Sequence, residues 1–349
     1  MLHFTPETLC DFVSRLFVAA GASQDEARVV AASLVGSNLR GYDSHGVALA
    51  RWYLSQIKNG ELVPGAAFTV RHETAALLAA DGGLGFGQLQ CGRLVDRVAA
   101  KARSVGVACG TLVQCGHVGR LGEWVERAAD QRLAALISVN DNGVIATVAP
   151  PGGTRGRIST NPIALAVPTG GDPLVLDIST SAVANGKLRI ARVEQRPVPL
   201  GWIQDAQGNP STDPNVMLAD PPGALLPFGG DQGYKGFGLG LMFDILSAGL
   251  AGGFCPPAPP GAKEWNNVLL VVWDPAQCAG AEHLTTEADK LVAAVRNTPR
   301  KQGVERIQLP GDRSAQARAL RAATGIPLAE EVWEQLTHMA AKLGVSVPA

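Results

Sequence analysis

The stretch between Gly233 and Gly253 restricts the fold of this chain more than any other. It opens as Gly-Tyr-Lys-Gly-Phe-Gly and then becomes an apolar run. Large apolar side chains recur in that run at helical spacing: Leu239, Met242, Phe243, Leu246 and Leu250. The pattern predicts a helix over residues 239–250, entered through a tight glycine-rich turn. Free backbone N–H groups at such a turn suit an anion, with Lys235 adding positive charge, and a buried helix packed closely at its glycines fits equally well.

The rest of the chain alternates between helical and strand patterns. Helices are expected over residues 6–20, after the capping box of Ser23 and Glu26, and over 47–57, 88–105, 123–131 and 284–296. Strands are expected over residues 68–70, 75–80, 107–112, 134–139, 161–168, 174–177, 268–273 and 307–309. Residues 150–227 are rich in proline and glycine and suggest strands and turns. The alternation predicts an α/β or α+β fold.

The composition excludes several classes of function. Acidic and basic residues, 31 and 30 of them, are spread along a chain of net charge -1, so no patch would attract nucleic acid or a membrane surface. No apolar run approaches the roughly 20 residues that span a bilayer. The six cysteines form no CxxC pair. We therefore expect reduced thiols, a cytoplasmic protein and no metal site.

Two histidines lie in glycine-bounded loops, His45 in Ser44-His45-Gly46 and His117 in Gly116-His117-Val118-Gly119. Histidine is the side chain best suited to exchange a proton near neutral pH, and a small neighbour lets a substrate reach the ring. Each histidine alone could equally satisfy a turn. The presence of two such loops in one chain favours a catalytic role.

A second candidate site follows the expected strand at 174–177. Its sequence is Asp177-Ile178-Ser179-Thr180-Ser181. The carboxylate, hydroxyl and N–H groups suit a ribose or a phosphate, but they also suit a turn that ends a strand. Asn161 and Lys187 are further polar side chains that could position a ligand.

The usual nucleotide-binding fingerprints are missing from the sequence. No GxGxxG motif follows an expected strand, and there is no Walker A motif. A dinucleotide would therefore have to bind in a fold other than the Rossmann fold.

Six short motifs in order carry a family resemblance: Arg40-Gly-x-x-Ser-His-Gly46, Gly116-His-x-Gly119, Thr160-Asn-Pro162, Asp177-x-Ser-Thr-Ser181 with Gly186-Lys187, Lys235-Gly-x-Gly-Leu239 and Leu309-Pro-Gly-Asp312. Together they resemble the type-2 malate/L-lactate dehydrogenase family of NAD(P)-dependent oxidoreductases. The likeness runs from Thr5 to about Leu343. The stretches Gly116–Arg120 and Leu309–Asp312, with Gly325-Ile-Pro327, are most similar to the hydroxycarboxylate dehydrogenase B branch.

The resemblance implies a homodimer with a non-Rossmann, mixed-sheet nicotinamide-binding domain and a helical domain formed by both chain ends. We divide the chain into residues 1–65 (helical), 66–255 (nicotinamide-binding) and 256–349 (the last strand of the sheet and helices that return to the helical domain). The implied cofactor contacts are Asn161, Asp177, Ile178, Ser179, Thr180, Ser181, Lys187, Lys235, Gly236, Pro310, Gly311 and Asp312. The resemblance also implies that His45 or His117 exchanges the substrate proton, with Ser44 assisting.

One position departs from the family pattern. Many members carry an arginine four residues after the first motif histidine, where it can grip a substrate carboxylate, and this chain has Leu49. We expect Arg120 to take over the carboxylate, unless it pairs with Glu123 at the entry to a helix. Leu49 would then open a larger or more apolar substrate pocket than malate needs.

These observations predict an NAD(P)-dependent dehydrogenase that interconverts a 2-oxo acid and a 2-hydroxy acid. Reduction of a cyclic imine acid such as pyrroline-2-carboxylate remains an alternative, as does a nucleotide-binding homologue without activity. Asp312 slightly favours NADH over NADPH because it would repel a 2′-phosphate, whereas Arg313 and Arg318 favour NADPH.

Overall fold

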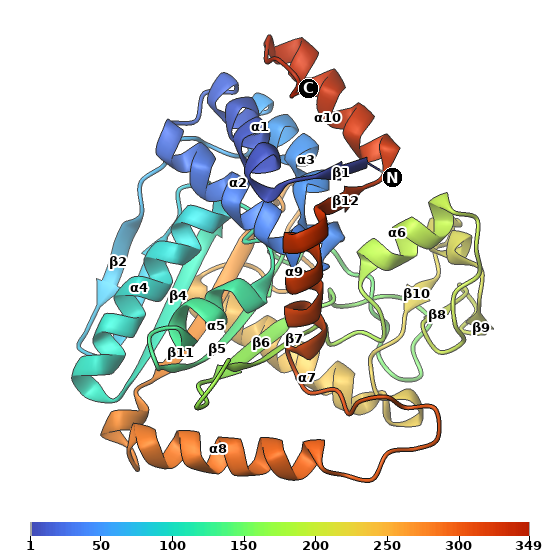
Figure 1. Ribbon diagram of the computed structural model, residues 1–349. Helices are drawn as coiled ribbons and strands as arrows, with labels where there is room; N and C mark the ends of the chain where they lie inside the picture. Colours follow the sequence, from blue (N-terminus) through green and yellow to red (C-terminus); the bar gives the residue numbers. More distant parts are fainter. Residues whose placement is uncertain (1, 349) are drawn as a thin grey trace.

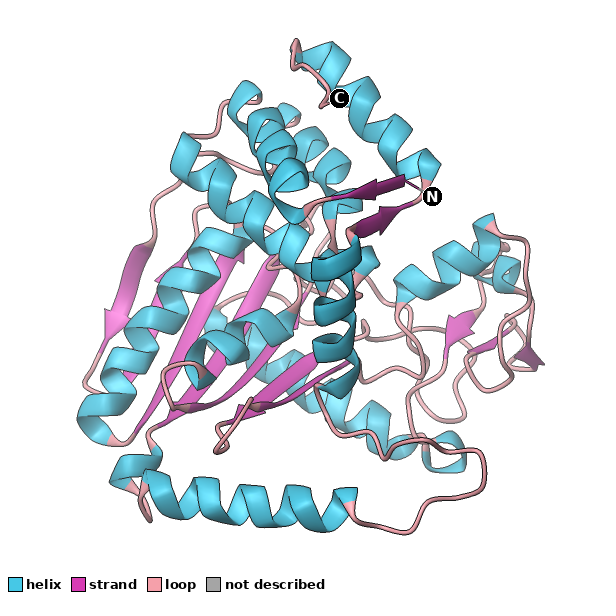
Figure 2. Cartoon of the chain, viewed as in Figure 1, coloured by secondary structure: helices cyan, strands magenta, loops and turns pink. Residues whose placement is uncertain are grey.

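A seven-stranded mixed sheet forms the centre of the protein (Figures 1 and 2). The computed structural model describes residues 2–348. In spatial order the strands are β2 (Thr69–Glu73), β3 (Leu77–Asp81), β4 (Val107–Cys115), β11 (Asn266–Trp273), β5 (Ala134–Asn140), β6 (Ile163–Val167) and β7 (Leu174–Ile178). Only β3 and β4 pair in parallel, and every other neighbouring pair in this sheet is antiparallel. The expected mixed α/β fold is confirmed, and its topology is not that of a Rossmann domain.

Helices α4 (Gly87–Val105) and α5 (Leu121–Ala129) cover one face of the sheet (Figure 1). Their apolar sides pack with the sheet into the largest core, in which Leu94, Val98 and Trp124 are buried. Gly110 on β4 lets α4 approach closely, because a Cβ there would lie 2.4 Å from Val98 Cγ2. The core therefore depends on a residue without a side chain at this contact.

A second core unites the two ends of the chain (Figure 1). It is built by α1 (Pro6–Ala19), α2 (Gln24–Leu39), α3 (Ala50–Lys58) and α10 (Glu330–Leu343). Strand β1 (Leu2–Phe4) pairs with β12 (Ile326–Leu328) and closes this group. The expected capping box of α2 is confirmed, since Ser23 and Glu26 bond each other's backbone N–H groups.

A small lobe lies beside the main sheet and is formed by the chain between β7 and α7 (Tyr234–Asp244) (Figure 1). It contains α6 (Asn185–Val193) and a three-stranded sheet of β10 (Ala224–Leu225), β8 (Ile203–Gln204) and β9 (Pro210–Ser211) around its own core. The expectation of only strands and turns over residues 150–227 is therefore wrong for α6. Buried Leu188 and Ala191 anchor that helix, but it is only nine residues long and lies in a proline- and glycine-rich segment, so its short apolar pattern does not stand out.

Two segments near the C-terminal end of the chain also differ from expectation. Helix α8 (Ala281–Arg296) runs along the lower end of the sheet in Figure 1 and does not join the helical core. Residues 307–309 form no strand, because they lead directly into α9 (Asp312–Thr324). The Asp312 carboxylate accepts from the backbone N of Leu309 (3.0 Å) and so holds this turn.

The glycine-rich stretch forms helix α7 (Tyr234–Asp244), which continues as a π-helical segment, Ile245–Gly249. The expected helix is thus confirmed, starting earlier than the pattern predicted. Its glycines permit close packing, because a Cβ on Gly236 would lie 2.4 Å from the Phe228 carbonyl oxygen. Its outer apolar side chains are not buried: Met242 is 56% exposed and Leu250 is 59% exposed. Among residues 2–348, no helix is long and apolar enough to cross a membrane.

Candidate active site

A cavity of about 670 Å³ lies where the strands of the main sheet end. The carboxyl ends of β4, β5 and β7 meet there with the beginnings of β11 and β6. The predicted site residues that line it are Ser44, His45, His117, Arg120, Asn161, Asp177, Ile178, Ser179, Ser181 and Lys187. The structure therefore brings together two histidine loops and a polar strand end that are far apart in the sequence.

His45 ends a short 3-10 turn, Asp43–His45, between α2 and the turn Val47–Leu49. The buried Asn38 side chain fixes it, since Asn38 Nδ2 donates to Asp43 Oδ1 (2.7 Å) and Asn38 Oδ1 accepts from Val47 N (2.8 Å). A Cβ at Gly46 would lie 2.2 Å from Asn38 Oδ1. The hydrogen bonds of Asn38 thus leave no room for a side chain at Gly46. A glycine there also leaves the His45 ring open to a substrate.

His117 has a defined tautomer. Its Nδ1 accepts from the Gly119 backbone N (3.2 Å) and lies 2.7 Å from the Tyr53 hydroxyl. Because Nδ1 accepts from the Gly119 N–H and so carries no proton, the Tyr53 hydroxyl donates to it, while the same hydroxyl accepts from Gln88 (3.0 Å). The hydrogen-bond network therefore assigns the His117 proton to Nε2, which leaves an N–H donor for a ligand.

The two imidazole rings stack with centroids 5.8 Å apart. Burial, with a smaller contribution from the Arg120 charge, lowers the pKa of His45 to about 4. Burial, with a smaller contribution from His45, lowers the pKa of His117 to about 3. Both rings are neutral at pH 7. His45 Nδ1 lies 3.1 Å from Ser44 Oγ, which can donate or accept, so His45 can hold its proton on either nitrogen.

Arg120 does not have the role expected of it. Its side chain is 3% exposed, and its two terminal nitrogens donate to the two carboxylate oxygens of Glu126 at 3.0 and 2.7 Å. Arg40 also binds Glu126 (2.9 Å). Glu123, the alternative partner, accepts instead from Ser33. The guanidinium is committed to a buried ion-pair network, so the prediction that it grips a substrate carboxylate is not supported.

The Asp177–Ser181 segment is held by the protein itself. Asp177 Oδ2 accepts from the Gly122 N at the start of α5 (2.8 Å) and lies 4.0 Å from Arg120. Burial raises the pKa of Asp177 despite these partners. The Ser179 and Ser181 hydroxyls donate to backbone oxygens two residues on, as in a turn, whereas the Thr180 hydroxyl donates to the Thr160 carbonyl before β6. Thr180 faces away from the cavity lining, whereas the other four residues border it.

Two acceptors on the cavity wall are buried without a donor among the described residues. They are Asn161 Oδ1 and Asp141 Oδ2. Asn161 adopts a φ of 32° and directs its Nδ2 to Asp244 Oδ2 (2.9 Å). Burial raises the pKa of Asp141 to about 6. Unsatisfied buried acceptors at a cavity indicate a ligand that supplies N–H or O–H groups.

Besides Thr180, three predicted residues line neither this cavity nor the second one described below. Leu49 packs beside the helical core, so it does not open a substrate pocket. Lys235 is exposed on α7, with its ammonium 6.0 Å from the centre of the Tyr234 ring. Gly236 is buried against Phe228 and the Thr180 carbonyl. The close-packing interpretation of the glycine-rich stretch thus fits the structure better than an anion-binding turn.

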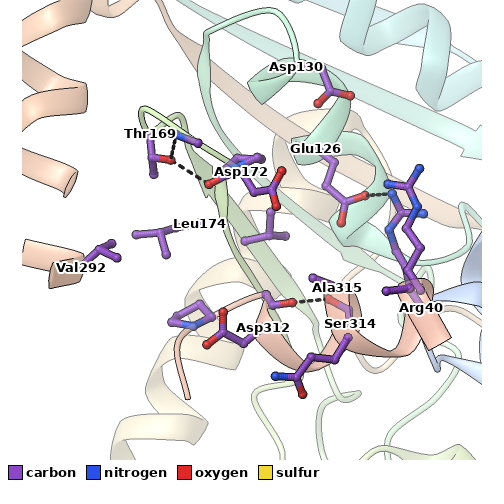
Figure 3. Close-up of a pocket in the computed structure, with 18 of the residues that line it drawn as sticks. Arg40, Glu126, Asp130, Thr169, Asp172, Leu174, Val292, Asp312, Ser314 and Ala315 are labelled. Carbon is purple, nitrogen blue, oxygen red and sulfur yellow. Dashed lines mark hydrogen bonds and ion pairs between the residues drawn. The ribbon is translucent and has the colours of Figure 1, made fainter. Parts of the chain in front are cut away.

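A second cavity, of about 830 Å³, adjoins the first along β7 and α5 and contains Pro310, Gly311 and Asp312 (Figure 3). Figure 3 shows the ion pair of Arg40 and Glu126 on one side of this cavity and Val292 of α8 on the opposite side. Arg296 and Arg306 both pair with Asp312, at 2.9 and 3.1 Å. Its negative charge is therefore balanced within the protein.

Several residues of the site carried no sequence signal. Tyr42 lies between the guanidinium groups of Arg120 and Arg313, 5.4 and 5.6 Å from its ring centre. Tyr53 falls in the middle of a helix and Asp141 in a loop after a strand. Tertiary structure brings Tyr53 to His117 and Asp141 to the cavity, whereas Tyr42 lies within the same motif as His45. In residues 2–348 no cluster of histidine, cysteine and acidic side chains is arranged to hold a metal ion.

Comparison with known proteins agrees with this architecture. The model of the malate/L-lactate dehydrogenase family matches residues 4–337. An L-lactate dehydrogenase of Cupriavidus necator is 34% identical over 95% of each chain. Hydroxycarboxylate dehydrogenase B of Escherichia coli O157:H7 is 32% identical over 98% of this chain and 95% of its own. The crystal structure of Δ1-piperideine-2-carboxylate reductase from Pseudomonas syringae superposes with a TM-score of 0.84 at 34% identity, over 97% of this chain and 100% of its own.

The fold and these matches define an oxidoreductase of the hydroxy acid dehydrogenase class. The chain belongs to the malate/L-lactate dehydrogenase family, whose dehydrogenases use nicotinamide cofactors.

The neutral histidines predict a pH dependence of stability. Between the folded pKa of His45, about 4, and its ordinary value of 6.5, the unfolded chain binds more protons, so stability falls as pH falls through this window. Asp141 acts in the opposite direction because its folded pKa is raised. We expect His45→Asn to lose less stability than the wild type between pH 7 and pH 5, by up to about 1.4 kcal/mol per pH unit. Urea unfolding would measure this. His338→Asn, at an exposed position, is the control. An equal pH dependence of stability in the wild type and both variants would contradict the prediction.

Proposed function

We propose that the protein interconverts a 2-oxo acid and a 2-hydroxy acid with NAD(P) as the hydride carrier. The observation that supports this most directly is the pair of neutral, stacked histidines at the end of the sheet. The test is oxidation of NADH and of NADPH, followed by absorbance, against a panel of 2-oxo acids and cyclic imine acids. Cofactor binding without turnover across the panel would instead indicate a nucleotide-binding homologue that has lost activity.

His45 is our candidate for proton transfer. A neutral imidazole can accept the substrate hydroxyl proton during oxidation, and Ser44 Oγ can bond His45 Nδ1 in either tautomer. His117 is our candidate for orienting the same oxygen, because its Nδ1 is held by Gly119 and Tyr53 and its Nε2–H is left to donate. This division assigns different roles to the two histidines that the sequence could not distinguish.

Lys187 is our candidate for binding the substrate carboxylate in place of Arg120. It lines the cavity and makes no ion pair among the described residues. A Cβ at the preceding Gly186 would lie 2.9 Å from Ser44 Cβ, so the start of α6 is close to the catalytic turn. An ammonium there can hold the carboxylate beside His45.

The cofactor fits the two adjoining cavities. When bound, the nicotinamide would donate or accept the hydride. Asn161 Oδ1 is buried without a donor and suits the carboxamide N–H₂. The adenosine end would reach Pro310, Gly311 and Asp312 in the second cavity. This arrangement keeps residues 66–255 as the nicotinamide-binding domain, with 1–65 and 256–349 completing the site.

The alternative substrate is a cyclic imine acid. It rests on the Pseudomonas syringae relative, a Δ1-piperideine-2-carboxylate reductase that matches over its whole length. The substrate panel distinguishes the two proposed substrate classes, because it includes both imine acids and oxo acids under the same assay conditions. Cytoplasmic location is also proposed, on the six free cysteines.

We expect the two histidines to differ kinetically. His45→Asn should lower kcat by about 10²–10⁴-fold, because it removes a positioned proton acceptor. Tyr53→Phe frees His117 Nδ1 from one donor and should lower kcat by about tenfold or less while leaving the nucleotide KM unchanged. Steady-state kinetics with the best oxo acid would measure both. A His45 variant with near wild-type kcat would contradict the assignment.

Cofactor preference should depend on Arg318. The pairing of Asp312 with two arginines removes the basis for favouring NADH, and Arg318 lines the same cavity with no hydrogen bond or ion pair in the described chain. We expect NADPH to be preferred and Arg318→Ala to raise its KM about tenfold, equivalent to about 1.4 kcal/mol, with little change for NADH. Arg28→Ala, on the exposed side of α2, is the control. Equal changes for both nucleotides would overturn the assignment.

We also propose a homodimer formed through α7. Its exposed apolar side chains, including Met242, Ile245 and Leu250, make the kind of surface that subunit contacts cover. Met242→Glu should raise the dimer dissociation constant at least about tenfold. Light scattering after size-exclusion chromatography would measure this, with Leu291→Glu on α8 as a control of similar exposure. A wild-type protein that is monomeric at micromolar concentration would refute the dimer.

A further inference from the structure

One wall of the active-site cavity is acidic, and the proposed reaction does not use it. Asp141 follows β5, and Glu264 precedes β11, the strand between β5 and β4. Both side chains line the cavity. His117 follows β4, two strands from Asp141, and neighbouring strands are about 4.8 Å apart. About 10 Å therefore separates the backbone at His117 from that at Asp141, a gap that a small substrate can bridge because side chains from both positions line the same cavity.

The Asp141 carboxylate has an unused acceptor. The residue is 8% exposed, its Oδ1 accepts from Ile145 N (3.4 Å), and its Oδ2 has no hydrogen-bond partner within 3.5 Å in residues 2–348. The Ser159 hydroxyl on the same cavity wall is nonetheless near enough to lower the pKa of the carboxyl, against the larger effect of burial, which raises it. A buried carboxylate oxygen without a donor is costly unless a ligand supplies one. Asp244, the nearby acid on α7, differs in this respect, because Asn140 and Asn161 each donate to it at 2.9 Å.

Charge is distributed unevenly in this cavity. The cations that line it are Arg120, Lys187 and Arg313. Arg120 is neutralised by Glu126, whereas Arg313, which lies over the Tyr42 ring, and Lys187 make no ion pair among the described residues, so these two cations remain for a carboxylate. No cation that borders the cavity is paired with Asp141 or Glu264 among the described residues. A substrate whose carboxylate binds near Lys187 would thus direct its other end toward the acidic wall.

We propose that Asp141, with Glu264, selects substrates by their end remote from the reacting carbon, accepting a hydrogen-bond donor there and excluding a second carboxylate. The selection has two physical sources. A second carboxylate would approach two negative charges in a partly dehydrated cavity, whereas a hydroxyl or N–H group would give Asp141 Oδ2 its missing donor. The protein would then act poorly on dicarboxylates such as malate. This inference rests on the proposed function, since it concerns the same cavity.

Three hydroxy acids with one carbon skeleton test this selection. Malate, 2-hydroxybutanoate and 2,4-dihydroxybutanoate differ only in a remote carboxylate, methyl or hydroxymethyl group. Their dissociation constants would be measured by calorimetry on the intact protein with reduced nucleotide present, where no turnover occurs, and kcat/KM would be measured separately. We expect the wild type to bind the dihydroxy acid best and malate worst.

Asp141→Asn removes the charge but keeps the shape and the bond from Ile145 N. We expect it to improve malate binding relative to 2-hydroxybutanoate about tenfold, which corresponds to about 1.4 kcal/mol. Glu264→Gln, nearer the rim, should change the ratio in the same direction by less. Asp25→Asn, an exposed aspartate on α2, is the matched control and should change nothing.

The outcomes separate this inference from the proposed function. An unchanged malate ratio in both cavity variants would overturn the inference, even if oxo acids turn over well. Weaker nucleotide binding in Asp141→Asn with an unchanged ratio would also overturn it, because the carboxylate would then belong to the cofactor site. A changed ratio in binding without any turnover would support the inference while refuting the proposed reaction.

Discussion

A buried network of asparagine side chains around Asp244 closes the end of the main sheet, and the site depends on it. Asn140 on β5 and Asn161 before β6 both donate to Asp244 on α7, and Asn267 on β11 donates to Asn140 Oδ1 (2.8 Å). Each bond joins a different strand to its neighbour or to the helix behind. Buried polar networks of this kind are rigid when satisfied. The bonds that are made hold the cavity floor, with Asn161 Oδ1 left open for a ligand, and Val118, beside His117, is tied to the same group through Asn266 Oδ1 (2.9 Å).

The sequence predicted those elements whose own period is strong or, as for α2, whose start is marked by a capping box. Helices α1, α2, α4 and α5 and the strands of the main sheet lie where the apolar patterns placed them, with small shifts at their ends. The pattern could not show that β1 pairs with β12, since that pairing joins opposite ends of the chain. It also could not show that the apolar side of α7 is exposed, because periodicity reports which residues share a face but not what covers that face.

The difference between local pattern and tertiary contact also explains which site residues the sequence could indicate. The glycine-bounded histidines carried a local signal, and the structure places them together, although their catalytic roles remain proposals. The prediction for Arg120 failed because its partner, Glu126, lies one and a half helical turns further on and the pair is buried by α2. Tyr53, Asp141 and Tyr42 gave no signal, because a single polar residue in a helix or loop has the same local pattern whether or not it faces a cavity.

The joining of the two chain ends also orders the assembly of the protein. β1 has no partner until β12 exists, and the turn that carries His45 is held by Arg321 of α9 through Asp43. A growing chain can therefore complete the sheet while its first helices still lack their last contacts. The contacts that complete the turn carrying His45 are among the most distant in sequence, and such contacts form slowly. A chain that stops before α9 would hold a sheet and its asparagine network but would have an open active site.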